Sequence, residues 1–256
     1  MYRGFNLTLD DYNEINYNVG RTIFDSHQSK IKKGLEHFID NDGSIDGQQL
    51  SEEWFPKIQA NLFISHSHND EKKALSLSGW LYQKFGLTSF IDSSVWGYSN
   101  DLLKIIDNAY CKTGEYYSYE KRNYSTSHIH MMLSAAITRM IDSCECLFFL
   151  NTPSSMKASS TISGRTNSPW IYSELVTSKL IRKRPLLHYR PDLIKAVFES
   201  REFSEGLGSI MHKAPLDHLT DLNKSDLSNW VKGCGEITHD DQYPLDVLYS
   251  IKPQKK

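Results

Sequence analysis

An unbroken apolar run from Cys146 to Leu150 is the feature that most constrains how this chain can fold. A strand with apolar residues at consecutive positions has both faces buried, which is typical of the centre of a parallel sheet. Parallel neighbours are joined by crossover connections that usually contain a helix. The run therefore predicts an α/β fold, with a mostly parallel central sheet and helices on both faces.

A strand–helix–strand pattern precedes this run. Residues 61–66 form a short apolar strand that ends in a polar turn. Residues 71–85 have the apolar spacing of a helix, and Gly86 follows as a C-terminal cap. A second strand covers residues 87–92. This order is the opening of a parallel sheet flanked by helices.

The chain between the second and third strands is long and varied. We expect a loop at 93–100 and a helix at 101–109, followed by a tyrosine-rich polar insertion at 111–127. A well-patterned helix at 128–141, capped by the preceding serine, leads back to the sheet. A fourth strand is predicted near residues 186–189.

The two ends of the chain differ in pattern from the middle. Residues 1–59 show an irregular helical stripe, so we expect a helical extension that packs on the central domain. The central domain spans residues 60–192. Beyond it, residues 193–256 contain only short helical pieces. The sequence thus predicts one α/β domain between helical N- and C-terminal extensions.

Charge and composition exclude several classes of protein. The 29 basic and 31 acidic side chains nearly balance, so no overall charge favours nucleic acid. The N-terminal residues lack the apolar core of a signal peptide, and no run is long enough to span a membrane. The four cysteines show no CxxC spacing and are expected to be reduced thiols. We therefore expect a cytoplasmic protein without nucleic-acid or membrane partners.

A helix that begins after Ser168 carries the most distinctive pair of side chains. Ser168 suits the N-cap and Pro169 suits the first helical position. Trp170 and Glu174 lie four residues apart, which places an indole and a carboxylate on one helical face. Taken alone, this pattern fits an ordinary amphipathic helix with a solvated Glu174.

Polar side chains at the ends of the predicted strands favour a functional role for this helix. Ser65 and His66 follow the first strand, and Asp92 follows the second. Open parallel sheets bind ligands at the carboxyl ends of their strands. An aromatic side chain at Trp96 or Trp170 can stack on a planar ring there.

Taken in this order, the segments resemble a Toll/interleukin-1 receptor (TIR) domain. The resemblance covers about residues 60–190 and is closest to the stand-alone TIR proteins of bacterial anti-phage defence, as in Thoeris-type systems. It is carried by four motifs: the strand 62–67 with Asp70, the strand 90–92, the loop 96–99, and the helix start 168–170 with Glu174 and Leu175.

The resemblance implies that Glu174 cleaves the nicotinamide–ribose bond of NAD+, which is a substrate and not a cofactor. The released ADP-ribosyl unit is often cyclised or joined to an acceptor, and the product then activates a separate effector. Self-association through TIR surfaces is also implied. The substrate-binding residues expected around Glu174 are Ser65, His66, Asp92, Trp96, Tyr98 and Trp170.

One carboxylate can suffice for this chemistry. Nicotinamide leaves NAD+ readily, so the general acid that ordinary glycosidases need is unnecessary. A single carboxylate can stabilise positive charge on the ribose, or bind its hydroxyls and deprotonate the acceptor.

Three other functions fit parts of the sequence. The chain can be a non-catalytic TIR module that recruits partners through the 96–99 loop, although such an adaptor has no need of Glu174. Some nucleoside ribosyl-transferring enzymes also use a glutamate at a sheet edge. Finally, His66, His68 and Asp70 follow a strand with the spacing of a metal-dependent hydrolase, but that signature expects a histidine where Glu71 stands.

Overall fold

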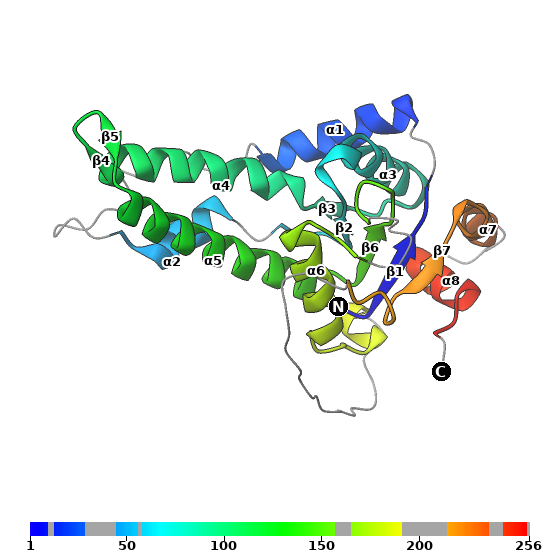
Figure 1. Cartoon of the computed structure of the whole chain (residues 1–256). Coiled ribbons are helices and arrows are strands. Elements are labelled where there is room, and N and C mark those ends of the chain that lie inside the picture. The colour runs from blue at the N-terminus through cyan, green and yellow to red at the C-terminus, as the bar shows by residue number, and fades with distance from the viewer. Residues whose placement is uncertain are drawn as a thin grey trace.

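A five-stranded parallel sheet forms the centre of the computed structural model (Figure 1). The structure describes residues 1–9, 13–28, 45–55, 58–156, 165–190, 214–235 and 243–254, and the side chains of 94–98 lie outside this description. In spatial order the strands are β3 (Ser89–Ile91), β2 (Leu62–Ser65), β6 (Cys146–Leu150), β1 (Arg3–Leu7) and β7 (Thr220–Leu222). The predicted α/β fold is confirmed, with a flavodoxin-like parallel sheet and surrounding helices.

Helices cover both faces of this sheet (Figure 1). In chain order they are α1 (Glu14–Gln28), α2 (Gly47–Trp54), α3 (Glu71–Phe85), α4 (Ser93–Ile106), α5 (Tyr119–Ser143), α6 (Pro169–Leu180), α7 (Lys224–Gly235) and α8 (Pro244–Ile251). The shorter elements are η1 (His68–Asp70), η2 (Asp107–Cys111), η3 (Leu186–Tyr189) and the hairpin of β4 (Lys112–Thr113) and β5 (Tyr116–Tyr117).

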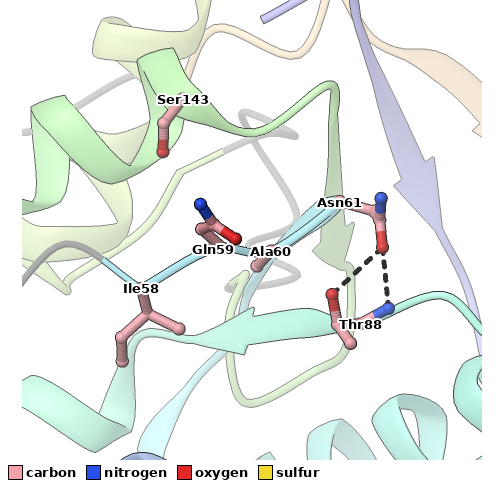
Figure 2. A pocket seen from close by; sticks show the side chains of 6 residues that line it. All are labelled: Ile58, Gln59, Ala60, Asn61, Thr88 and Ser143. Carbon is pink, nitrogen blue, oxygen red and sulfur yellow. Dashed lines mark hydrogen bonds between the residues drawn. The ribbon is translucent and has the colours of Figure 1, made fainter. Parts of the chain in front are cut away.

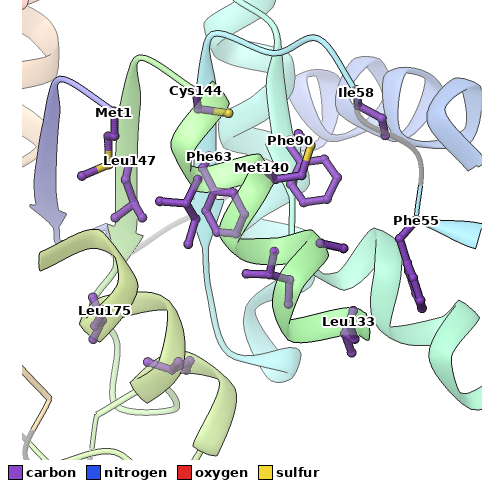
Figure 3. Close-up of a cluster of buried hydrophobic side chains, with 14 of the residues drawn as sticks. Met1, Phe55, Ile58, Phe63, Phe90, Leu133, Met140, Cys144, Leu147 and Leu175 are labelled. Carbon is purple, nitrogen blue, oxygen red and sulfur yellow. The ribbon is translucent and has the colours of Figure 1, made fainter. Parts of the chain in front are cut away.

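Strand β6 joins two hydrophobic cores because its side chains alternate between the faces. Leu147 and Phe149 enter the core formed with α2, α4, α5 and α6. Figure 3 shows this core, where Leu147 and Phe63 lie between the sheet and the helices α5 and α6. Phe148 and Leu150 enter the opposite core, formed with α1, α3, α7 and α8. The expected central position of this strand is confirmed.

Local sequence signals fix the ends of two helices as predicted. Helix α3 ends where Gly86 adopts a left-handed conformation with φ 65°. Helix α6 begins after Ser168, whose side chain accepts a hydrogen bond from the backbone N–H of Ile171, with Pro169 at its first position.

Each terminal segment contributes a strand to the sheet as well as helices. Strand β1 lies between β6 and β7, and its Phe5 and Leu7 are buried in the core of α1 and α3. Strand β7, in the C-terminal segment, pairs with β1 and supplies the fifth strand. We did not expect either strand, because both are too short for a clear alternating pattern.

Three of our local predictions are wrong. The predicted strand at 186–189 is the 3₁₀ helix η3, which follows Pro185 and ends at Arg190. Arg190 is held there by hydrogen bonds to the carboxylates of Glu145 and Asp246. In the sheet, the edge of β6 opposite β2 is paired with β1.

The other two errors concern helix starts. Residues 93–100 are not a loop, because the Asp92 side chain accepts a hydrogen bond from the N–H of Ser93 and caps α4 directly. Helix α5 begins at Tyr119 after its N-cap Ser118, so it includes the second half of the polar insertion. The first half of the predicted insertion consists of the hairpin β4–β5 and its neighbouring residues.

Helices α1 and α3 cross at a pair of glycines. A Cβ atom on Gly79 would lie 1.9 Å from the carbonyl oxygen of Asn16, and one on Gly20 would lie 1.8 Å from that of Leu75. The two backbones therefore approach more closely than any other residue type allows.

We predict that Gly79→Ala lowers the free energy of unfolding by about 2 kcal/mol or more, because overpacking outweighs the helix propensity gained. Gly47→Ala is the matched control, since a Cβ there meets no atom within 4 Å, and it should change stability by less than about 0.5 kcal/mol. Urea unfolding of both variants tests this. Equal stability of the two would show that the helices do not cross here.

Candidate functional site

Four polar side chains meet at the carboxyl ends of β2 and β3. Ser65 ends β2 and His66 follows it, Asp92 follows β3, and Glu174 reaches them from α6. All four are buried, and Ser65 and Glu174 have no exposed surface. We call this set the strand-end cluster.

Glu174 accepts a hydrogen bond and has a raised pKa. The Ser65 hydroxyl donates a hydrogen bond of 2.6 Å to its Oε2, which confirms the expected proximity of the two residues. Its Oε1 has no hydrogen-bond partner in the structure as described. Burial raises the pKa of Glu174 well above the usual glutamate value, the charge of Asp92 raises it further, and the Ser65 hydrogen bond opposes the rise.

His66 is paired with Asp92. Its Nδ1 lies 2.5 Å from Oδ1 of Asp92, a contact that is an ion pair when the ring is protonated. Burial by itself lowers the pKa of His66, whereas the carboxylates of Asp92, Glu71 and Asp70 raise it, with a net rise above the usual histidine value.

The position of the cluster follows from the order of the strands. After β2 the chain crosses by α3 to β3 on one side, and it then returns by α4 and α5 to β6 on the other side of β2. The sheet therefore has a topological switch point between β2 and β6. Ligands of open α/β sheets bind at such points, outside the carboxyl ends of the strands. Ser65 lies at the end of β2, and Glu174 lies on α6, the helix that follows β6 in the chain.

A second polar network, which sequence analysis missed, joins the ends of β2 and β6. The Thr152 hydroxyl donates a 2.5 Å hydrogen bond to Oδ2 of Asp70, and the Ser67 hydroxyl donates to the same oxygen. Lys73 Nζ lies 3.5 Å from the other oxygen of Asp70. The sequence feature that could have indicated this network is Thr152, a polar residue two positions after the central strand.

The residues of the predicted metal alternative have separate surroundings. His66 contacts Asp92, His68 is exposed, and Asp70 is bonded to Thr152 and Ser67. Within the described ranges, no three His, Cys, Asp or Glu side chains are grouped so that they could hold a metal ion.

The predicted aromatic residues are only partly placed. Trp170 is half-buried, and its ring packs edge to face against His130 of α5, with centroids 5.5 Å apart. It thus contributes to the contact between α5 and α6. Trp96 and Tyr98 belong to α4, but their side chains lie outside the described residues.

A pocket of about 590 Å³ lies away from the strand-end cluster, at the amino ends of β2 and β3. Figure 2 shows its lining, which includes Asn61, Thr88 and Ser143. The Asn61 side chain accepts hydrogen bonds from the backbone N–H and the hydroxyl of Thr88. None of the described residues that line this pocket is titratable, so the strand-end cluster remains the better candidate for chemistry.

Comparisons of the chain with protein-family models, curated proteins and solved structures find no match. Function is therefore inferred from the residues of the site. None of the helices described here has the length and apolar content needed to cross a membrane.

The raised pKa of Glu174 makes stability depend on pH. Between the ordinary glutamate pKa and the raised one, the folded chain binds more protons than the unfolded chain, so the free energy of unfolding falls as pH rises. Glu174→Gln removes this contribution. We predict that the loss of stability from about pH 5 to about pH 8 is smaller in this variant than in wild type.

Urea unfolding at both pH values provides the measurement, and Glu115→Gln on the exposed hairpin is the control. The control should follow the wild-type pH dependence. Identical pH dependence in wild type and Glu174→Gln would mean that Glu174 titrates normally in the folded chain.

Proposed function

We propose that the protein is a TIR-type NAD+ nucleosidase that cleaves the nicotinamide–ribose bond with Glu174. The observation that supports this most is the buried contact of Glu174 with Ser65 at the topological switch point of a parallel sheet. A carboxyl group in these surroundings has a perturbed pKa, which is characteristic of functional sites.

The proposed chemistry needs one carboxylate. The bond between C1′ of the ribose and the nicotinamide nitrogen breaks, and the bonding electron pair leaves with nicotinamide. Ionised Glu174 stabilises the positive charge that develops on the ribose. Water or a hydroxyl group then forms the new bond to C1′, and its proton passes to the Glu174 carboxylate.

We further propose that the ADP-ribose-derived product is a signal in anti-phage defence. By this proposal the protein acts in the cytoplasm, where it consumes NAD+ and activates a separate effector through its product. This part is supported only by the resemblance of residues 60–190 to defence-type TIR proteins. Self-association of the chain belongs to the same proposal.

One observation favours a second candidate, a non-catalytic TIR interaction module. Glu174 and Ser65 have no exposed surface, so substrate cannot reach the carboxylate unless the site opens. A buried, hydrogen-bonded glutamate can also serve only to join α6 to the sheet. The two candidates differ in whether loss of Glu174 abolishes nicotinamide release.

We predict that Glu174→Gln lowers the rate of nicotinamide release from NAD+ by about a hundredfold or more, because it removes the charge that stabilises the ribosyl cation. The assay compares wild type, Glu174→Gln and Glu115→Gln under identical conditions, with thermal unfolding measured alongside. The Glu115→Gln control should retain wild-type activity.

A folded Glu174→Gln variant with wild-type turnover would remove Glu174 from the mechanism. Wild-type protein that releases no nicotinamide would favour the interaction module. Assays with nucleosides in place of NAD+ test the ribosyl-transfer alternative.

We also predict that specific activity rises with protein concentration, because the closed site of a single chain needs a neighbouring copy or a trigger to open. Nicotinamide release is measured over a hundredfold dilution series, with the oligomeric state followed by light scattering. Activity that is high and constant down to single protomers would contradict this prediction.

A further inference from the structure

His66 lies behind Asp92 in a continuous row of buried groups. The order in the row is His66, Asp92, Glu174 and Ser65, as given by the ion pair, the interaction between the carboxyl groups and the hydrogen bond. Each member is buried. His66 therefore contacts Asp92 and not Glu174, although sequence analysis assigned both His66 and Asp92 to the substrate.

Two carboxyl groups placed side by side in the interior repel each other when both are ionised. Burial makes this repulsion stronger than in water, and one of the two then keeps its proton. Asp92 acts on Glu174 in this way. A positive charge beside Asp92 reduces the repulsion, and Nδ1 of the His66 ring lies 2.5 Å from Oδ1 of Asp92.

Other charged groups among the described residues also act on this row. Asp70 and Glu71, at the start of α3, act on His66 and favour its protonated form. Asp70 is itself held by Thr152, Ser67 and Lys73. Ser65 is the neighbour that favours the ionised form of Glu174. Protonated His66 thus supplies positive charge next to Asp92, and the carboxylates around it raise its pKa.

We propose that His66 is a positioning residue that holds the Asp92 carboxylate in an ion pair and thereby limits the repulsion of Glu174 by Asp92. The consequence is that Glu174 can ionise at a pH where the chain is active. The inference rests on the proposed role of Glu174, but the charge coupling itself is independent of the substrate.

A purely structural role for the pair makes a different prediction. Asp92 also caps α4 through the N–H of Ser93, so the pair can simply hold β2 and α4 together. In that case its loss lowers stability but leaves the titration of Glu174 where it is. The titration of Glu174 therefore separates the two roles.

The test follows the carboxyl carbon of Glu174 by NMR in protein labelled with ¹³C-glutamate, with the resonance identified by its absence in Glu174→Gln. His66→Gln should move the titration midpoint of Glu174 upwards by about one pH unit or more, a tenfold change in its acid dissociation constant. Asp92→Asn should move the midpoint downwards. His66→Gln added to Asp92→Asn should have little further effect, because His66 acts through Asp92.

His68→Gln is the matched control, because His68 is an exposed histidine two residues along the same chain. It should leave the Glu174 midpoint unchanged. The inference is overturned if His66→Gln leaves the midpoint in place or lowers it, or if its effect is the same with and without Asp92. If His66→Gln does not fold, Asp92→Asn decides the matter: a midpoint that does not fall overturns the inference.

Nicotinamide release measured against pH separates this inference from the proposed function. If the protein is an NAD+ nucleosidase, the acid limb of its pH–rate profile moves with the Glu174 midpoint in each variant. Shifted midpoints in a protein that releases no nicotinamide would sustain the charge coupling and reject the enzyme. Glu174-dependent release with unshifted midpoints would sustain the enzyme and reject the charge coupling.

Discussion

The pairing of β6 on both of its edges is the constraint on which the rest of the structure depends. Its partners, β1 and β2, come from segments far apart in the sequence, and its two faces belong to two separate cores. This strand therefore fixes where β2 ends and where the chain continues towards α6. The meeting of Ser65 and Glu174 is a consequence of that arrangement.

The strand-end cluster combines a reactive arrangement with a closed environment. An uncompensated carboxylate in the interior is costly, so burial favours protonated Glu174, and Asp92 acts in the same sense, while the Ser65 hydrogen bond opposes it. A protein that uses Glu174 on a substrate must open this region and ionise the carboxyl group. The same two requirements would keep an NAD+-consuming enzyme inactive until a trigger or a neighbouring copy is present.

Strong local signals made much of the fold predictable from sequence. The apolar run of β6, the Gly86 cap and the Ser168–Pro169 helix start each depend on neighbouring residues and were confirmed. Strand β1 was not predictable, because its five residues are stabilised by pairing with β6 and β7 and not by their own pattern. The same limit applies to the site: the approach of Glu174 to Ser65 follows from strand order, but the ion pair of His66 with Asp92 depends on side-chain packing.

The most direct test of the arrangement is a double-mutant cycle between Ser65→Ala and Glu174→Ala, measured by urea unfolding. If the two side chains share a buried hydrogen bond, their effects on the free energy of unfolding are non-additive by about 1 kcal/mol. The cycle needs no substrate, so it tests the site independently of its function. Effects that add to within about 0.3 kcal/mol would contradict the contact on which the site is built.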